Sequence, residues 1–101
     1  MKEMYETKGD TLYVMVGAEL DHHNAGSIGV DSDKYIYSNK AKNVVFDFQN
    51  TKFMDSSGIG VIMGRYKLVS GIGGTVRIKN INQTLDRIFL LSGLYKIVEK
   101  E

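Results

Sequence analysis

The fold is decided by residues 53–67, FMDSSGIGVIMGRYK, in which a strand pattern changes to a helical pattern at a polar corner. Just before them, residues 44–48 form a nearly continuous apolar run, as expected of a strand covered on both faces. The N-cap of the following helix is either Asp55 or Ser56, because each side chain can accept from its first free backbone N–H groups. The helical spacing predicts one buried stripe, formed by Ile59, Ile62, Met63, Tyr66 and Val69.

The chain begins with two alternating runs. Residues 5–7 and 11–16 flank Lys8-Gly9-Asp10, and this arrangement predicts a β-hairpin. Alternate side chains of a strand point to opposite faces, so the second strand should turn one set to the core, namely Leu12, Val14 and Val16.

A first helix is predicted over residues 24–39. Asn24 is its candidate N-cap, and apolar side chains at helical spacing follow it. Gly26 and Gly29 weaken the prediction, since each costs a helix about 1 kcal/mol relative to alanine. The second half, residues 33–39, carries the clearer helical pattern.

The helix that follows the polar corner is expected to end at Gly71. This glycine is free to adopt the left-handed conformation, and Ile72 is placed to fold back against the helix. Residues 75–79 then alternate as a strand, with Val76 and Ile78 facing inward.

A third helix is predicted after Asn82, a good N-cap, and it should end at Ser92-Gly93. Its buried face should hold Leu85, Ile88, Phe89 and Leu91. Residues 95–98 are interpreted as a last short strand. The predicted order is therefore ββαβαβαβ, an α/β fold in which right-handed crossovers join the strands into a mixed, mostly parallel sheet.

Composition narrows the classes of function. The formal net charge is +1, from 13 basic and 12 acidic residues, so we expect no direct contact with nucleic acid. The chain lacks an apolar run of about 18 residues and an N-terminal signal pattern, which predicts no membrane contact and a cytoplasmic location. The absence of cysteine excludes disulfides and thiol catalysis.

A hydrolase site and a metal site are alternatives to a purely structural role for these polar residues. A serine hydrolase built on Ser56 lacks a preceding glycine at position 54 and any histidine downstream of the serine. The two histidines present, His22 and His23, are adjacent and have no accompanying metal-ligand spacing, so they are interpreted as part of a polar loop. Catalytic residues, a metal site and a cofactor are therefore not predicted.

A family resemblance rests on the Asp55-Ser56-Ser57-Gly58 motif and on three further stretches. These are residues 17–23 (GAELDHH), Gly73-Gly74, and residues 91–97 (LSGLYKI). In these motifs, which span nearly the whole chain, the sequence resembles the STAS-domain anti-sigma factor antagonists, the anti-anti-sigma factors of spore-forming bacteria. The resemblance implies a single STAS domain over residues 1–101 with a regulatory, non-enzymatic role.

The resemblance also implies the partners. The unmodified protein would bind an anti-sigma factor that is also a serine kinase and would thereby free a sigma factor. The kinase would phosphorylate Ser56, and a protein serine phosphatase would reset it. The docking surface that the resemblance implies comprises Asp21, Asp55, Ser56, Ser57, Gly58, Ile59 and Gly60. It extends to Ile62, which also falls on the predicted core stripe.

Two competing hypotheses remain beside this one. The chain is alternatively a STAS structural subunit of a stress-sensing or transport assembly, in which Ser56 is only a cap. The more remote alternative is the small serine hydrolase.

The predicted central helix carries two glycines on one side. Gly60 and Gly64 lie four residues apart, a spacing typical of close packing against another element.

Overall fold

The main sheet grows from the predicted hairpin. The computed structural model describes residues 2–101 and contains a five-stranded sheet in the order β1-β2-β4-β6-β7. The strands are β1 (Met4–Lys8), β2 (Thr11–Met15), β4 (Asn43–Asp47), β6 (Val76–Lys79) and β7 (Glu99–Lys100). Strands β1 and β2 are antiparallel and every other pair is parallel. The predicted mixed, mostly parallel sheet is confirmed.

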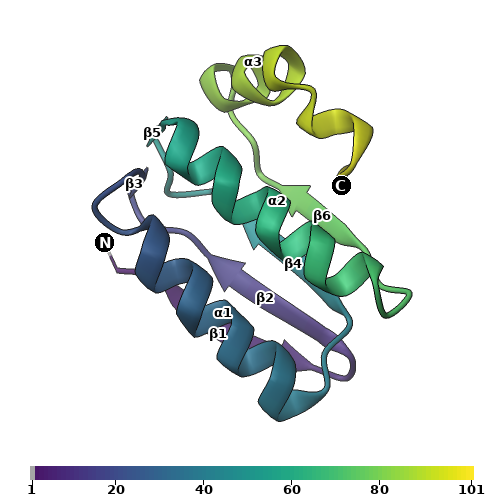
Figure 1. The fold of residues 1–101 in the computed structure, drawn as a ribbon. Coiled ribbons are helices and arrows are strands. Elements are labelled where there is room, and N and C mark those ends of the chain that lie inside the picture. The colour runs from purple at the N-terminus through teal and green to yellow at the C-terminus, as the bar shows by residue number, and fades with distance from the viewer. Residues whose placement is uncertain (1) are drawn as a thin grey trace.

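The helices α1 (Ala25–Asn39) and α2 (Ser56–Ser70) lie side by side over one face of this sheet, and α3 (Gln83–Ser92) lies at one end of it (Figure 1). The arrangement follows from the topology. Strands β2, β4 and β6 step across the sheet in one direction, and right-handed crossovers taken in one direction place their helices on the same face. The core between helices and sheet includes Leu12, Val14 and Val16, as predicted.

Strand β4 is buried on both faces, as predicted, but helices cover only one of them. Phe46 faces the helices and belongs to the core. Val45 points to the other face and is fully buried there, although it lies outside the main core. Its partners in register on the neighbouring strands are Tyr13 and Arg77. The long side chains of these two residues cover it, because such side chains can lay their apolar parts along a surface while the polar ends stay in water.

A second sheet was not predicted. Strands β3 (Glu19–Leu20) and β5 (Phe53–Met54) form a separate, parallel two-stranded sheet. Backbone hydrogen bonds extend the pairing on both sides, from Lys52 N to the Ala18 carbonyl at 2.8 Å and from Asp55 N to the Leu20 carbonyl at 3.2 Å. Two residues are too few to show alternation, so this pair leaves no periodic signal in the sequence. It places the chain before α1 beside the chain before α2.

Helix α1 is regular through both of its glycines. A Cβ atom at Gly26 would have nothing within 4 Å, whereas one at Gly29 would lie 2.7 Å from an Arg65 guanidinium nitrogen. Gly29 therefore leaves room for Arg65, which pairs with Asp33 at 3.0 Å. The prediction that Asn24 caps the helix through its side chain is wrong, because its Oδ1 accepts from Asp21 N instead.

The predicted stripe of α2 is only partly correct. Ile62 and Val69 are fully buried, but Met63 is 41% exposed and Val61 is buried in its place. The end of the helix also differs from the prediction. Gly71 keeps a right-handed conformation with φ −66°. The left-handed residue is Gly73, with φ 82°.

Ile72, predicted to fold back against α2, is 55% exposed instead. The chain turns later than predicted because Gly74, not Ile72, closes against the structure. Its N–H bonds the Val69 carbonyl at 2.8 Å, and a Cβ atom there would lie 1.4 Å from the Lys42 carbonyl oxygen.

Helix α3 begins as predicted, with Asn82 Oδ1 accepting from Leu85 N at 2.9 Å, and it ends at Gly93 in a left-handed conformation. Leu85 and Phe89 are buried, but Leu91 is 77% exposed. The spacing explains the error. Leu91 lies about 200° around the helix from Phe89, and this short helix packs on one side only.

The predicted strand over residues 95–98 is wrong. The chain forms a short 3₁₀ helix, η1 (Leu94–Lys96), and the strand β7 comes after it. Tyr95 has a strand-like neighbourhood in the sequence, but its hydroxyl bonds the Asp86 carboxylate on α3 and its ring packs on Phe89 at 5.6 Å between centroids. These contacts require a turn, because they fold the chain back on α3.

Candidate functional site

The corner before α2 is capped by Asp55. Its Oδ1 accepts a hydrogen bond from Ser57 N at 2.8 Å, in the geometry of an N-cap. This decides between the two capping residues considered from the sequence. Ser56 is then the first residue of the helix, and it is exposed. Its hydroxyl is not needed to cap the start of the helix, because Asp55 already does so.

The second oxygen of Asp55 reaches a distant loop. Asp55 Oδ2 accepts from His22 N at 3.2 Å, and the Nδ1 atom of the His22 ring lies 3.5 Å from the same oxygen. These residues are 33 positions apart. Sequence reasoning missed this contact, since the capping pattern used only one oxygen of the carboxylate. The only signal was the polar, histidine-containing stretch itself.

Asp21 is buried in the same loop, where it organises the backbone. Its Oδ1 accepts from His23 N at 3.0 Å, while its own N–H donates to Asn24 Oδ1 at 2.9 Å. Asn24 Nδ2 donates in turn to the Glu19 carbonyl at 2.7 Å. Asp21, expected at the docking surface, is thus placed next to the corner, but its carboxylate serves mainly to hold the loop.

Both carboxylates are held in the charged form. Burial raises the pKa of Asp55, but hydrogen bonds from the N–H groups of Ser57 and His22 outweigh this effect, and its pKa lies below the ordinary value of 3.8. Burial likewise raises the pKa of Asp21, and the bond from the His23 N–H and the charge of that histidine bring it below 3.8. The corner therefore carries two negative charges at neutral pH.

The remaining predicted docking residues differ in exposure. Gly58 is buried, and a Cβ atom there would lie 2.5 Å from Met54 Cγ and 2.8 Å from the Leu20 carbonyl oxygen. Its role is to let α2 approach β3 and β5 closely. Ile59 is half-buried, Gly60 is exposed, and Ile62 is fully buried in the core. Ile62 therefore offers no surface to a partner.

Gly60 lines a shallow groove between α1 and α2 of about 360 Å³. Ser57 and Arg65 line the same groove from α2, and Gly26 and Val30 line it from α1. A Cβ atom at Gly60 or Gly64 would meet nothing within 4 Å, so the expected close packing inside the molecule is absent at these two positions. The missing side chains keep the groove next to the corner open.

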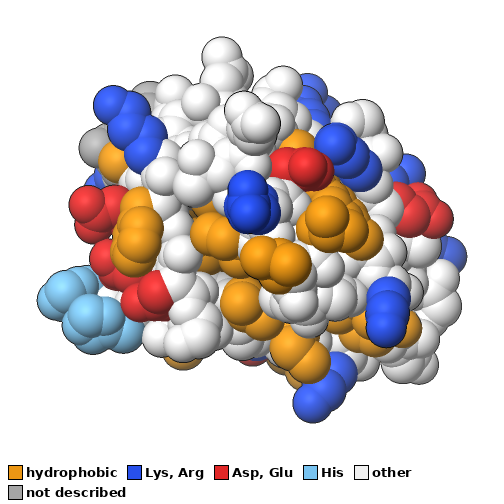
Figure 2. Space-filling view, turned by 90° about the horizontal axis from the view of Figure 1, so that it is seen from above, with side chains coloured by type: hydrophobic (Ala, Val, Ile, Leu, Met, Phe, Trp, Pro, Cys, Tyr) orange, Lys and Arg blue, Asp and Glu red, His pale blue; other side chains and the backbone are white. Residues whose placement is uncertain are grey.

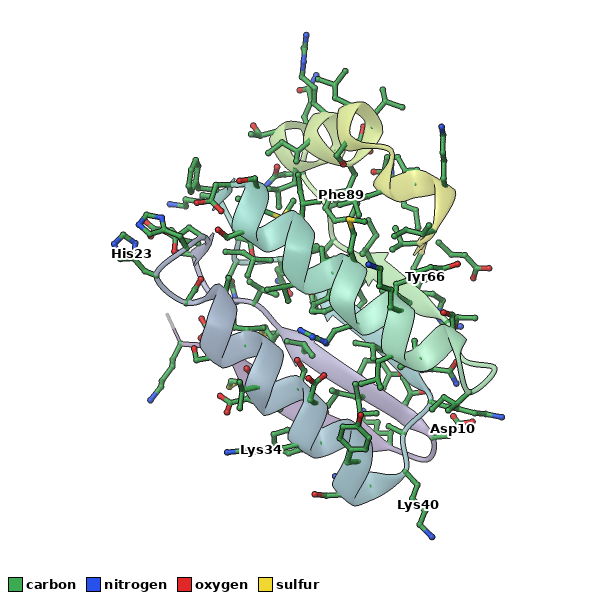
Figure 3. All side chains as sticks on the ribbon, viewed as in Figure 1. Asp10, His23, Lys34, Lys40, Tyr66 and Phe89 are labelled. Atoms are coloured by element: carbon green, nitrogen blue, oxygen red, sulfur yellow. The ribbon has the colours of Figure 1, made fainter. Side chains whose placement is uncertain are left out.

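The histidines lie at one end of the molecule. The His23 side chain projects outward there (Figure 3). Figure 2, seen from above, shows the histidines at the left edge with acidic side chains beside them. Apolar side chains gather in the middle of that face, with Lys and Arg side chains around the apolar ones. Over residues 2–101, no three His, Cys, Asp or Glu side chains come together as a metal site. In the same range, no helix is long and apolar enough to cross a membrane.

Comparisons with known proteins agree on one family. The model of the STAS domain matches residues 2–100. An anti-sigma F factor antagonist of Paenibacillus polymyxa is 38% identical over 96 residues, which cover 95% of this chain and 81% of that protein. A second anti-sigma F factor antagonist, from Lysinibacillus sphaericus, is 28% identical over 84% of this chain and 73% of its own length.

Solved structures agree with this result. The anti-sigma factor antagonist SpoIIAA in its unphosphorylated form superposes with a TM-score of 0.80 at 23% identity, over 98% of this chain and 86% of that chain. The phosphorylated form of SpoIIAA, described as a Bacillus cell fate determinant, gives a TM-score of 0.78 at 26% identity, over 98% and 90% of the two chains. The chain thus belongs to the STAS domain family and, within it, to the anti-sigma factor antagonists.

Proposed function

We propose that this chain is a cytoplasmic anti-anti-sigma factor controlled by phosphorylation of Ser56. In its unmodified form it binds an anti-sigma factor that is also a serine kinase, and the bound sigma factor is released. The observation that carries the proposal is an exposed serine at the first position of α2, beside a neighbour that already provides the cap. The similarity to antagonists of anti-sigma F factor supports the same role.

The kinase supplies the chemistry. The Ser56 oxygen forms a bond to the γ-phosphorus of ATP while the bond from that phosphorus to the ADP oxygen breaks, and the hydroxyl proton passes to a base of the kinase. Mg²⁺ and ATP are bound by the kinase. A phosphatase later hydrolyses the phosphate ester with water and restores the hydroxyl.

The fold should tolerate this phosphate. The modification adds a charge of about −1.5 to −2, and the N-terminus of a helix favours negative charge. The partner should not tolerate it. If the partner's surface fits the neutral Ser56 hydroxyl, then binding the phosphorylated form would require stripping water from a dianion next to Asp55. Burying that charge without an opposite charge to pair with it is costly.

The first test uses an anti-sigma factor kinase with ATP and Mg²⁺, followed by mass spectrometry. One phosphoryl group should be added to the wild-type chain and to Ser57→Ala, and none to Ser56→Ala. Ser57 is the matched control, because its capping contact uses the backbone N–H, which alanine retains. Phosphorylation of Ser56→Ala at the wild-type rate would refute the assignment of the site.

The second test measures binding of Ser56→Asp to the same kinase. We expect weaker binding with an unchanged circular dichroism spectrum and melting temperature, since residue 56 is exposed. Equal binding of the wild type and Ser56→Asp would favour a STAS structural subunit without a phosphoswitch.

A further inference from the structure

The His22 imidazole lies beside Asp55, the residue that directly precedes Ser56. Its Nδ1 is 3.5 Å from Asp55 Oδ2, and its backbone N–H bonds the same oxygen. The side chain of His22 is 69% exposed, so the ring can rotate while the backbone bond holds the loop. Ser56 follows Asp55 directly in the chain. His22 and Ser56 are thus both direct neighbours of Asp55, one by contact and one along the chain.

The charges around this ring are mostly negative. Asp55 faces it from the start of α2, Asp21 and His23 lie beside it in the loop, and Glu19 precedes the loop on β3. Glu3 borders the loop through a 3.5 Å contact with Asn24 Nδ2. Among the described ion pairs, the basic partners of Asp55 and Asp21 are the two histidines. Phosphate on Ser56 would add a dianion to this acidic corner.

We propose that His22 is the counter-ion of phosphorylated Ser56: its imidazolium turns from Asp55 to the phosphate and donates a hydrogen bond to it. The inference rests on Ser56 as the phosphorylation site. The ring takes up a proton from solvent when the dianion is present, and no other bond forms or breaks. His22 thereby reduces the negative charge that the phosphorylated protein presents.

His23 is the natural control, since it has the same side chain but a different neighbour. Its Nδ1 lies 3.7 Å from Asp21 Oδ1, in a loop contact that does not involve the start of α2. The centroids of the two rings are 4.0 Å apart, so both rings are exposed to nearly the same electrostatic potential. A general electrostatic effect would act on both histidines, whereas a specific contact with the phosphate would involve His22 alone.

The experiment uses protein that carries phosphoserine at position 56, incorporated during translation so that no kinase is needed. The phosphate of the wild type, His22→Asn and His23→Asn is titrated by ³¹P NMR. In His22→Asn the midpoint should rise by about half a pH unit, as expected for loss of one partly exposed ion pair. In His23→Asn it should stay at the wild-type value. The ring ¹⁵N signals at pH 7 should show His22 shifting toward the imidazolium form on phosphorylation.

Equal midpoints in His22→Asn and His23→Asn, or a His22 ring unchanged by phosphorylation, would overturn the inference. The melting temperatures of the unphosphorylated variants establish that each one folds. Because the phosphate is installed without a kinase, these results do not depend on the proposed function. Failure of the kinase to modify Ser56 would refute that function while leaving the His22 measurement intact.

Discussion

At the scale of single residues, the corner assigns separate roles to neighbouring side chains. Asp55 satisfies the start of α2 with one oxygen and holds the His22 loop with the other. Ser56, next to it, takes no part in the cap. Capping is thus carried out by Asp55 and the modification that we propose by Ser56, so that a change in one does not require a change in the other.

Two glycines of α2 should respond oppositely to alanine. Gly58→Ala should lower the free energy of unfolding by about 1–3 kcal/mol, because the new Cβ would overlap Met54 and the Leu20 carbonyl. Gly60→Ala should raise it by up to about 1 kcal/mol, since the new Cβ meets open space and alanine favours the helix. Urea denaturation of both variants measures the difference. Equal destabilisation of the two variants would contradict the close approach at Gly58.

The sequence identified the residues of this corner but not their contacts. Asp55, Ser56 and the following residues stand out because a strand pattern changes to a helical one among polar side chains. The contact between Asp55 and His22 could not be predicted, because it spans 33 residues and depends on the β3–β5 pairing. Gly58 and Gly60 look alike in the sequence, and only the surrounding atoms show that one is required by the fold.

At the scale of elements, side-chain capping starts two of the three α-helices within residues 2–101. Asp55 and Asn82 each accept from a backbone N–H within the first turn of the following helix. Helix α1 starts differently, because the Asn24 side chain bonds the loop before it. The sequence pattern therefore predicts where these helices begin, but not which capping side chains serve another purpose.

Because Asp55 caps α2 in its charged form, part of the free energy of unfolding should be lost when the carboxylate is protonated at acid pH. The folded-state pKa of Asp55 lies below 3.8, so its charged form stabilises the protein above about pH 4. That contribution is lost as the pH falls through the folded-state value. Asp55→Asn keeps one acceptor but loses the charge and cannot accept from both Ser57 and His22, so it should melt below the wild type at pH 7. Its loss of stability below pH 4 should be shallower, and the two proteins should converge as Asp55 protonates. Thermal melts from pH 7 to pH 2 measure this.

Asp21 and Asp86 also have lowered pKa values, so the acid loss in Asp55→Asn should be reduced and not abolished. A wild-type acid profile in Asp55→Asn would contradict the hydrogen bonds assigned to this carboxylate.

Elements with strong periodicity were predicted, and those set by tertiary contacts were not. The alternation in β2 and β6 and the capping residue of α3 were correct. The exposed positions of Met63 and Leu91 were missed, because an apolar residue at nearly helical spacing looks buried until the neighbouring layer is known. The 3₁₀ turn at Tyr95 was missed because its cause, the Asp86 carboxylate, lies on another element.

At the scale of the whole molecule, the last strand is fastened through α3. Tyr95 donates its hydroxyl hydrogen to Asp86, and Lys100 Nζ of β7 contacts the same carboxylate at 3.1 Å. The sheet therefore ends in a strand of two residues that pairs with β6 along the main chain and is also tied to α3 by these side chains.

This attachment should weaken at high pH. Burial, and then the hydrogen bond to Asp86, raise the pKa of Tyr95 from 10.0 to about 12. A raised folded-state pKa stabilises the protein below the unfolded value, and the contribution is lost as the pH rises through about 12. Tyr95→Phe should be less stable at pH 8 and should lose less further stability between pH 10 and pH 12. Urea denaturation across this range provides the measurement.

Tyr5, whose pKa is also raised to about 12, remains in that variant. Part of the loss of stability at alkaline pH should therefore persist in Tyr95→Phe. An unchanged alkaline profile in Tyr95→Phe would show that Tyr95 contributes nothing to it.

The small sheet of β3 and β5 has a consequence for divergence among related chains. It is held by main-chain bonds, and the side chains of Glu19 and Phe53 on it are exposed. Substitution at these two positions should leave intact the β3–β5 pairing next to Asp55 and Ser56. Related chains can therefore differ at these two exposed positions, beside the proposed phosphorylation site, and still keep the main-chain pairing that positions it.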